Sequence, residues 1–295
     1  MRVFVTGATG FIGTEVVREL LQAGHAVRGL TRSDAGAEQL TAAGAQVHRG
    51  ELENLDSLRT GAAGMDAVVH LAFNHDLSQF AKSAQDERHA IEALGSALEP
   101  GKLLVVTSGT GLAGGAPGHV RTEDDPPASS AVIPRQPEHT AHAAAERGLH
   151  VAIVRLPQVH DTRKQGLVPM LTQLAREKRL SAYIGAGANR WAAAPLADVA
   201  LLYRLVVERT GPGATVYHAV QEEGVPMRDI AETLAKGLRV PALSLDPEAA
   251  AGHFGRLIHF AALDMPASSH RTRRLLDWSP TGPGLIEDLT HMNYL

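Results

Sequence analysis

The sequence predicts an α/β protein built around a doubly wound parallel sheet. The chain opens with a short β-branched run at residues 3–6, then glycines at positions 7, 10 and 13, then an amphipathic stretch at 11–23. This is the order of a strand, a tight turn and a helix. Apolar runs then alternate with helical periods, which implies right-handed crossovers between parallel strands. A length of 295 residues can bury a sizeable core of this kind.

The elements of this sheet follow one another in a regular order. Strands are expected at residues 3–6, 25–31, 46–49, 67–72, 102–108 and 151–156. Helices are expected at residues 11–23, from 35, from 54, at 77–98 and at 136–147. The stretch 109–134 holds five glycines and four prolines, so it is expected to be a loop. Because it follows a strand at the ligand-binding edge of the sheet, this loop is a candidate lid.

Beyond Pro157 the pattern is less regular. Helices are expected near residues 167–176, 195–208, 227–238 and 247–254, and a late strand at 216–219. We therefore expect a Rossmann domain over residues 1–160. Residues 161–295 should form a small C-terminal substrate-facing region, interleaved with late strands and helices of the Rossmann core.

Composition excludes several classes of protein. The net charge is −4 and the isoelectric point is near 6.4, so a basic nucleic-acid footprint is absent and a small-molecule substrate is the expected partner. The chain has no cysteine, which excludes disulfides, thiolate catalysis and cysteine-bound metal. It has no signal peptide and no long apolar run that could span a membrane. We expect a cytoplasmic, soluble protein.

The glycine-rich turn is the most specific motif. Gly7 lets the backbone turn sharply, Gly10 lets a pyrophosphate approach with no Cβ in the way, and Gly13 lets the helix pack close to the strand. The helix N-terminus offers free N–H groups and a positive dipole to the phosphates. The motif predicts a dinucleotide cofactor held by Gly7, Thr9, Gly10, Phe11, Ile12 and Gly13.

The end of the second strand indicates which dinucleotide is bound. An acidic residue there would bind the ribose 2′-hydroxyl of NAD, whereas a basic residue would accept the 2′-phosphate of NADP. Residues 28–33 contain no carboxylate, and Thr31, Arg32 and Ser33 offer two hydroxyls and a planar guanidinium. The sequence therefore favours NADP(H).

Four motifs occur in the order found in a known family. They are TGATGFIG at 6–13, DAVVHLA at 66–72, VVTS at 105–108 and VRLPQVH at 154–160. With them the chain resembles the short-chain dehydrogenase/reductase superfamily, in its extended or atypical, epimerase-like branch. The tail, with DMPASS at 264–269 and LDWSP at 276–280, also resembles that family.

The resemblance implies further cofactor contacts. Residues after the fourth strand, Leu71, Ala72 and Phe73, should pass near the adenosine ribose. Pro157, Gln158 and Val159 should flank the nicotinamide. Both groups stand at carboxyl ends of expected strands, where open α/β sheets bind ligands. Many members form dimers, so the resemblance leaves a homodimer open.

The family's usual proton relay is absent. It needs a tyrosine four residues before a lysine, and none of the tyrosines here has one. Pro134 and Glu138 occupy the matching positions. Ser108 and Thr110, at the end of the fifth strand, remain to orient a substrate, and a serine can donate a hydrogen bond to developing negative charge.

Another side chain could supply the proton. The candidates are His160, Tyr183 and Trp191. His160 titrates in the useful range, and an alternative structural role for it stays open. Asp198 is expected to be a structural or helix-start carboxylate. His139 and His142 lie three apart on a helix but have no visible third ligand, so no metal is expected.

These observations favour an NADPH-dependent oxidoreductase that reduces a small organic substrate, namely a carbonyl compound, an iminium ion or an activated C=C bond, without a tyrosine and lysine relay. The alternative is a non-catalytic NADP(H)-binding protein that senses redox state. A sugar-nucleotide epimerase or dehydratase is disfavoured, because the tyrosine and lysine are missing and no basic cluster for a second diphosphate is visible.

Overall fold

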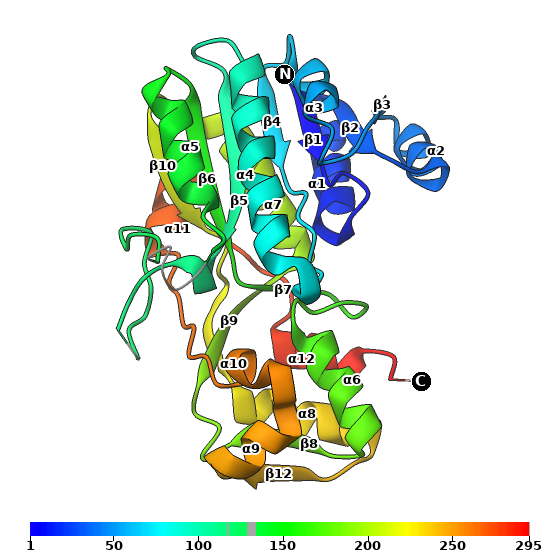
Figure 1. The fold of residues 1–295 in the computed structure, drawn as a ribbon, viewed down its shortest axis with the longest axis vertical. Coiled ribbons are helices and arrows are strands. Elements are labelled where there is room, and N and C mark those ends of the chain that lie inside the picture. The colour runs from blue at the N-terminus through cyan, green and yellow to red at the C-terminus, as the bar shows by residue number, and fades with distance from the viewer. Residues whose placement is uncertain (117, 129–133, 295) are drawn as a thin grey trace.

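A computed structural model describes residues 1–116, 118–128 and 134–294 of the chain. Figure 1 shows an upper lobe built on a twisted sheet and a smaller lower lobe that joins it at a narrow waist. Residues 117 and 129–133 of the expected loop 109–134 lie outside the described residues.

The upper lobe contains a seven-stranded sheet in the order β10-β6-β5-β4-β1-β2-β3, with every neighbouring pair parallel. Its strands are β1 (Arg2–Thr6), β2 (Ala26–Thr31), β3 (Gln46–Arg49), β4 (Ala67–His70), β5 (Leu103–Gly109), β6 (His150–Leu156) and β10 (Ala214–His218). The expected doubly wound fold is therefore confirmed. The strand order reverses between β1 and β4, and ligands bind in such sheets at the crevice formed there.

Helices cover both faces of this sheet. On one face α1 (Phe11–Gln22) and α7 (Leu196–Arg209) pack against Val3 and Val5, while Phe4 points to the opposite face. That face is covered by α3 (Leu55–Ala62), α4 (Phe80–Ala97) and α5 (Pro137–Glu146), of which α4 and α5 lie in front in Figure 1. The alternation follows from the two-residue period of a strand. A further helix, α2 (Asp34–Ala43), connects β2 to β3.

The lower lobe has its own sheets and apolar core. Its strands are β7 (Gln158–His160), β8 (Ser181–Ile184), β9 (Arg190–Pro195), β11 (Glu222–Pro226) and β12 (Ala242–Leu245). They form a three-stranded sheet, β11-β9-β7, and a parallel pair, β12-β8. The helices are α6 (Val168–Lys178), α8 (Met227–Leu238), α9 (Pro247–Phe254), α10 (Ile258–Ala261) and α12 (Leu285–His291). The fully buried Trp191 lies in the core between them.

The chain crosses the waist repeatedly after residue 160. Helix α7, strand β10 and α11 (His270–Leu276) return to the upper lobe, and β10 forms the outer edge of the main sheet. Asp198 on α7 accepts hydrogen bonds from the backbone N–H groups of Thr281 (3.0 Å) and Gly282 (2.8 Å), and its carbonyl accepts one from Trp278 Nε1. The expected structural role of this carboxylate is thus confirmed.

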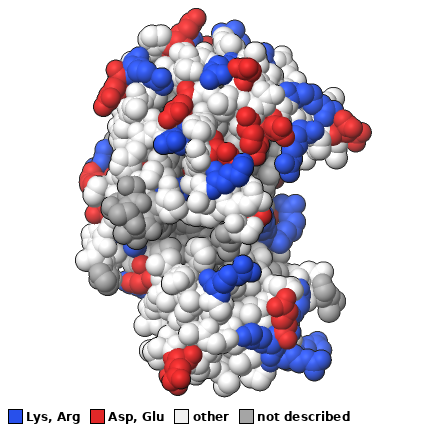
Figure 2. Space-filling view, in the orientation of Figure 1, with Lys and Arg blue, Asp and Glu red and all other residues white. Residues whose placement is uncertain are grey.

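The surface gives two further observations. Figure 2 shows acidic and basic side chains interspersed over the visible face, with no continuous basic surface there. Among the described residues, no helix is both long enough and apolar enough to cross a bilayer.

Candidate functional site

The turn between β1 and α1 forms a cradle that only glycine can build. Gly7 has φ +67°, and a Cβ there would lie 2.9 Å from the backbone nitrogen of Ala72. A Cβ at Gly13 would lie 2.0 Å from the carbonyl oxygen of Gly7. The Gly10 N–H donates to the Gly7 carbonyl at 2.9 Å, and no side chain caps the start of α1. The first N–H groups of the helix therefore remain available to an anion.

The end of β4 is tied to the end of β1. The Thr6 hydroxyl is hydrogen-bonded to His70 Nδ1 at 2.8 Å and accepts the N–H of Ala72 at 3.4 Å. Burial, with a smaller contribution from Arg135, lowers the pKa of His70 to about 3, so this imidazole is neutral at physiological pH. These bonds fix the backbone of Leu71 and Ala72 beside Gly7, as a cofactor wall requires.

The three residues at the end of β2 have different roles. The Ser33 hydroxyl accepts the N–H of Gly36 at 3.1 Å and caps α2, and the Thr31 hydroxyl accepts the N–H of Ser33 at 3.4 Å. Arg32 is exposed and forms no ion pair with any described residue. Among the three residues expected to contact a 2′-phosphate, Arg32 is thus the one whose side chain has no partner among the described residues.

The expected nicotinamide wall follows β6. Gln158 and Val159 belong to β7, and Val159 is buried in the core beneath α7. The Gln158 amide oxygen accepts the N–H of Leu167 at 2.8 Å. Residues 157–159 therefore connect the upper sheet to the lower lobe, with the Gln158 side chain turned toward the loop that precedes α6.

Glu138 stands where the family has its lysine, and it forms a buried ion pair. The Arg155 guanidinium donates to both oxygens of this carboxylate, from Nε at 2.8 Å and from Nη2 at 2.7 Å. Each of the two side chains is 1% exposed. The Ser108 hydroxyl donates to Glu138 Oε1 at 2.7 Å. The Ser108 hydroxyl, which is expected to orient a substrate, therefore donates its single proton to an acceptor inside the protein.

A second buried ion pair lies beside the first. Arg135 on the segment before α5 donates to both oxygens of Glu87 on α4, at 2.9 and 2.6 Å, and its guanidinium stacks 4.0 Å above the Phe73 ring. Burial raises the pKa of Glu87, and Arg135 opposes that shift. The position next to the missing tyrosine therefore holds a cation fixed against the end of β4.

The other proposed catalytic residues are dispersed. Thr110 is buried, and its hydroxyl donates to the Leu156 carbonyl at 3.4 Å. His160 is fully buried on β7, where its Nδ1 lies 2.7 Å from Asp288 Oδ2 and its Nε2 has no hydrogen-bond partner among the described residues. Tyr183 lies on β8, whose partner strand is β12, in the lower lobe (Figure 1).

The structure does not bring Tyr183 to the edge of the main sheet. Its ring faces the Arg228 guanidinium at 5.8 Å and packs against Gly187. The reason is that β8 pairs within the lower lobe and takes Tyr183 into that core. Trp191 is likewise fully buried, with its indole N–H donating to the Leu263 carbonyl at 3.2 Å.

Several residues of the site were missed by sequence reasoning. Arg155 also donates to the carbonyls of Thr122 (3.3 Å) and Asp125 (2.8 Å), so it anchors the loop between β5 and α5. The signal for Arg155 was a charge inside an otherwise apolar strand, which requires a buried partner. No comparable signal marked Arg135, because its partner Glu87 lies on another helix.

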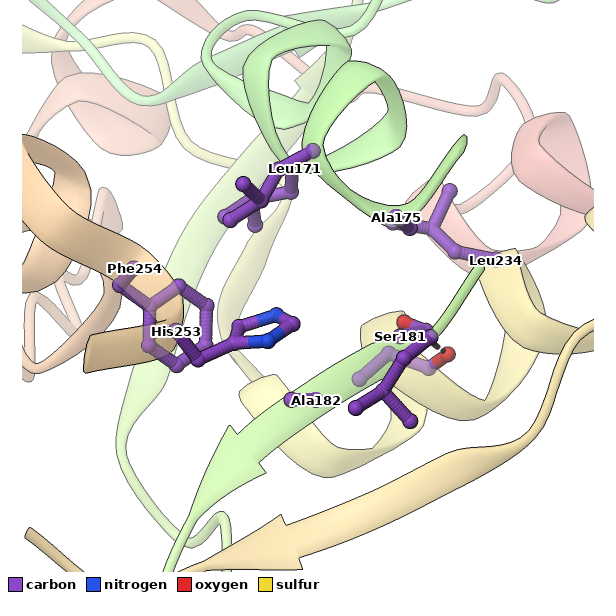
Figure 3. Close-up of a pocket in the computed structure, with 10 residues that line it drawn as sticks. Leu171, Ala175, Ser181, Ala182, Leu234, His253 and Phe254 are labelled. Carbon is purple, nitrogen blue, oxygen red and sulfur yellow. Dashed lines mark hydrogen bonds between the residues drawn. The ribbon is translucent and has the colours of Figure 1, made fainter. Parts of the chain in front are cut away.

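The lower lobe contains a small internal cavity, shown in Figure 3. Its volume is about 10 Å³, and the His253 imidazole points into it among apolar neighbours such as Leu171 and Phe254. Burial lowers the pKa of His253. A space of this size holds one water at most. This cavity is therefore too small to bind a substrate. Among the described residues, no group of three or more side chains is placed to hold a metal ion.

Comparison with known proteins agrees with the geometry of the cradle. A family described as NAD(P)H-binding matches residues 7–181. An uncharacterized protein of Schizosaccharomyces pombe is 42% identical over the full length of both chains. A 4-hydroxy-2-methyl-3-oxo-4-farnesyl-3,4-dihydroquinoline-1-oxide ketoreductase of Stigmatella aurantiaca is 28% identical, over 86% of this chain and 80% of its own.

Among solved structures, the dTDP-glucose 4,6-dehydratase DesIV of Streptomyces venezuelae, solved with NAD bound, has a TM-score of 0.76. The match covers 99% of this chain and 95% of DesIV at 19% identity. At that identity the likeness concerns the fold.

Proposed function

This chain belongs to the NAD(P)H-binding family, in the atypical branch of the short-chain dehydrogenase/reductase superfamily, and we propose that it is an NADPH-dependent reductase of a small organic substrate. One observation carries the proposal. The dinucleotide cradle at β1 is intact, while both hydroxyls at the end of β5 donate to acceptors within the protein.

The cradle fits a dinucleotide because its backbone leaves no room for side chains. Gly7 and Gly13 keep the turn in contact with the end of β4, and the uncapped start of α1 faces the position of a pyrophosphate. Arg32 is free to bind a 2′-phosphate, and residues 28–33 offer no carboxylate to a ribose 2′-hydroxyl. These features support NADPH over NADH.

The bound cofactor would supply hydride to the substrate carbon. Reduction of a ketone produces an alkoxide that needs a proton, whereas an iminium carbon is already electrophilic and its product is a neutral amine. Ser108 and Thr110 donate inward, and the Tyr/Lys relay is absent. The arrangement therefore suits an iminium ion better than a simple ketone or aldehyde. Hydride addition to an activated C=C bond gives a delocalised enolate, which is a weaker base than an alkoxide and can take its proton from water.

In this proposal the buried ion pair has a positioning role. Ser108 and Arg155 hold the Glu138 carboxylate, and Arg155 in turn holds the carbonyls of Thr122 and Asp125. The network thereby fixes the loop between β5 and α5 at the carboxyl end of the sheet.

The direct test is NADPH oxidation, followed optically, against ketones, aldehydes, cyclic imines and enones, with NADH in parallel. We expect turnover with NADPH, fastest for imines or enones. Turnover confined to NADH would contradict the cofactor choice. Turnover confined to ketones and aldehydes would contradict the argument from the missing donor.

A second function is favoured by the burial of the β5 hydroxyls. Ser108 is 2% exposed and Thr110 3%, so neither offers a contact to a substrate as the residues stand. The alternative is a non-catalytic NADP(H)-binding protein that reports redox state to a partner. Tight NADPH binding with no turnover across the panel would favour it over the reductase.

A further inference from the structure

The loop between β7 and α6, residues 161–167, is a turn held by internal hydrogen bonds, and it contacts the first residue of α1. The Asp161 carboxylate accepts the backbone N–H groups of Arg163 (2.7 Å) and Lys164 (2.8 Å). The Gln165 side-chain amide donates to the Asp161 carbonyl at 2.8 Å. Such bonding fixes where the loop presents its side chains. Figure 1 shows this loop, in green, near the end of the upper lobe at which α1 begins.

The loop places Lys164 beside the side chain of the first residue of α1. Lys164 Nζ lies 5.6 Å from the ring centroid of Phe11, the first residue of α1 and the residue directly after Gly10. The positive charge of Lys164 also contributes, after burial and Arg135, to lowering the pKa of His75 in the loop after β4. Lys164 therefore lies beside the start of α1, on the side that faces the loop after β4.

The ammonium of Lys164 has no anionic partner among the described residues. Its neighbour Arg163, by contrast, is paired with Asp161 at 2.8 Å. Lys164 is exposed, and its long stem lets the ammonium move by several ångströms. An unpaired cation beside uncapped helical N–H groups is suited to a phosphate.

We infer that Lys164 binds the pyrophosphate of the cofactor, across the cradle from the N-terminus of α1. The inference rests on the proposed cofactor site and adds a ligand from beyond the first 160 residues. Because the loop connects β7 to α6, cofactor binding would also tie the lower lobe to the main sheet. The pyrophosphate is common to NADH and NADPH, so Lys164 should serve both equally.

The test is the dissociation constant for NADPH and for NADH, measured by calorimetry on the full chain. We expect K164A to weaken both cofactors by about tenfold and K164E to weaken them further, because a charge-assisted contact is lost. K164R should stay close to wild type. The control is R163A, whose side chain is 75% exposed and lies outside the proposed contact. Thermal unfolding checks that each variant is folded.

The outcomes separate this inference from the proposed function. If wild type and K164A bind both cofactors equally well, Lys164 has no such contact and the inference fails alone. A loss for NADPH only would place the contact at the 2′-phosphate and overturn the inference. If the wild-type chain binds neither cofactor, the proposed function fails and takes the inference with it.

Discussion

Two parts of the same sheet edge differ in how closely they keep the family's pattern. At β1 and β4 the cradle keeps the glycines and the close backbone contacts that a dinucleotide needs. Beside β5 and β6, Pro134 and Glu138 stand at the positions of the family's tyrosine and lysine, and Ser108 and Arg155 bind the Glu138 carboxylate. The first part keeps the family's pattern for binding NAD(P)H, and the second departs from the family's pattern for proton transfer.

The comparison indicates which positions of such a protein tolerate substitution. A cradle made of backbone tolerates no added Cβ, because the clash would be with other backbone atoms. A proton donor can be exchanged when the substrate no longer needs it, provided that the buried charges remain paired. A buried glutamate at the lysine position therefore comes with a partner, and that partner is Arg155.

The largest effect is expected from breaking that pair. Arg155→Met leaves the Glu138 carboxylate buried without a cation and should cost about 3–5 kcal/mol of the free energy of unfolding. The free energy is measured by urea denaturation. The double variant Glu138→Leu/Arg155→Met removes both charges and should be more stable than Arg155→Met alone. A cost below about 1 kcal/mol for the single variant would show that the pair is not as isolated from water as its burial indicates.

The next largest effect is expected at the cradle. In Gly13→Ala the new Cβ would meet the Gly7 carbonyl at 2.0 Å, which forces the turn to shift. Overpacking of this kind costs about 1–3 kcal/mol, so NADPH affinity should fall by about 5- to 150-fold in a fluorescence titration. The matched control is Gly252→Ala on α9, where a Cβ would meet nothing within 4 Å. Unchanged affinity in Gly13→Ala would break the comparison.

Both parts contribute to the pH dependence of stability. His70, beside the cradle, has a pKa lowered to about 3, and His218, beside Arg155, has one lowered to about 4, in both cases chiefly by burial. As pH falls below about 6.5, the unfolded chain binds protons that the folded chain does not, so each group lowers stability by about 1 kcal/mol per pH unit. The loss continues down to the folded pKa.

Unfolding of His70→Gln measured at pH 7, 6 and 5 checks this dependence. The free energy of unfolding of the variant should fall less steeply as pH falls, because the contribution of His70 is lost and that of His218 remains. An unchanged slope would mean that His70 is protonated in the folded protein.

The smallest effect is expected at the end of β2. Arg32→Ala removes the proposed 2′-phosphate contact and should weaken NADPH by about tenfold, with NADH unaffected. Equal affinity of wild type and Arg32→Ala for NADPH would point away from NADP specificity.

Much of the upper lobe could be predicted from the sequence. Its strands are continuous apolar runs, because they are buried on both faces, and glycines mark the turn after β1. The structure places these strands and helices within a few residues of the expected ranges. The lower-lobe strands could not be predicted in this way. β9 is built around three consecutive alanines and β8 reads SAYI, so neither carries the run of β-branched residues that marks a strand.

Only the part of the site that is formed by the backbone could be predicted from the sequence. The cradle follows from glycine spacing, but the partner of Ser108 depends on strand register, which sets Ser108 beside Arg155 on the neighbouring strand. Helix α5 then brings Glu138 to both. No local sequence pattern predicts that side chains from β5, β6 and α5 come into contact. For the same reason the packing of Tyr183 against Gly187 and Arg228, away from the edge of the main sheet, could not be foreseen.

One measurement tests the central claim most directly. NADPH-dependent turnover is compared for a cyclic iminium ion and the ketone of the same ring skeleton, as kcat/KM across pH. The account predicts a clear preference for the iminium ion, because the Ser108 and Thr110 hydroxyls both donate to acceptors within the protein. A preference for the ketone, with a pH profile that reports an essential acid, would contradict it.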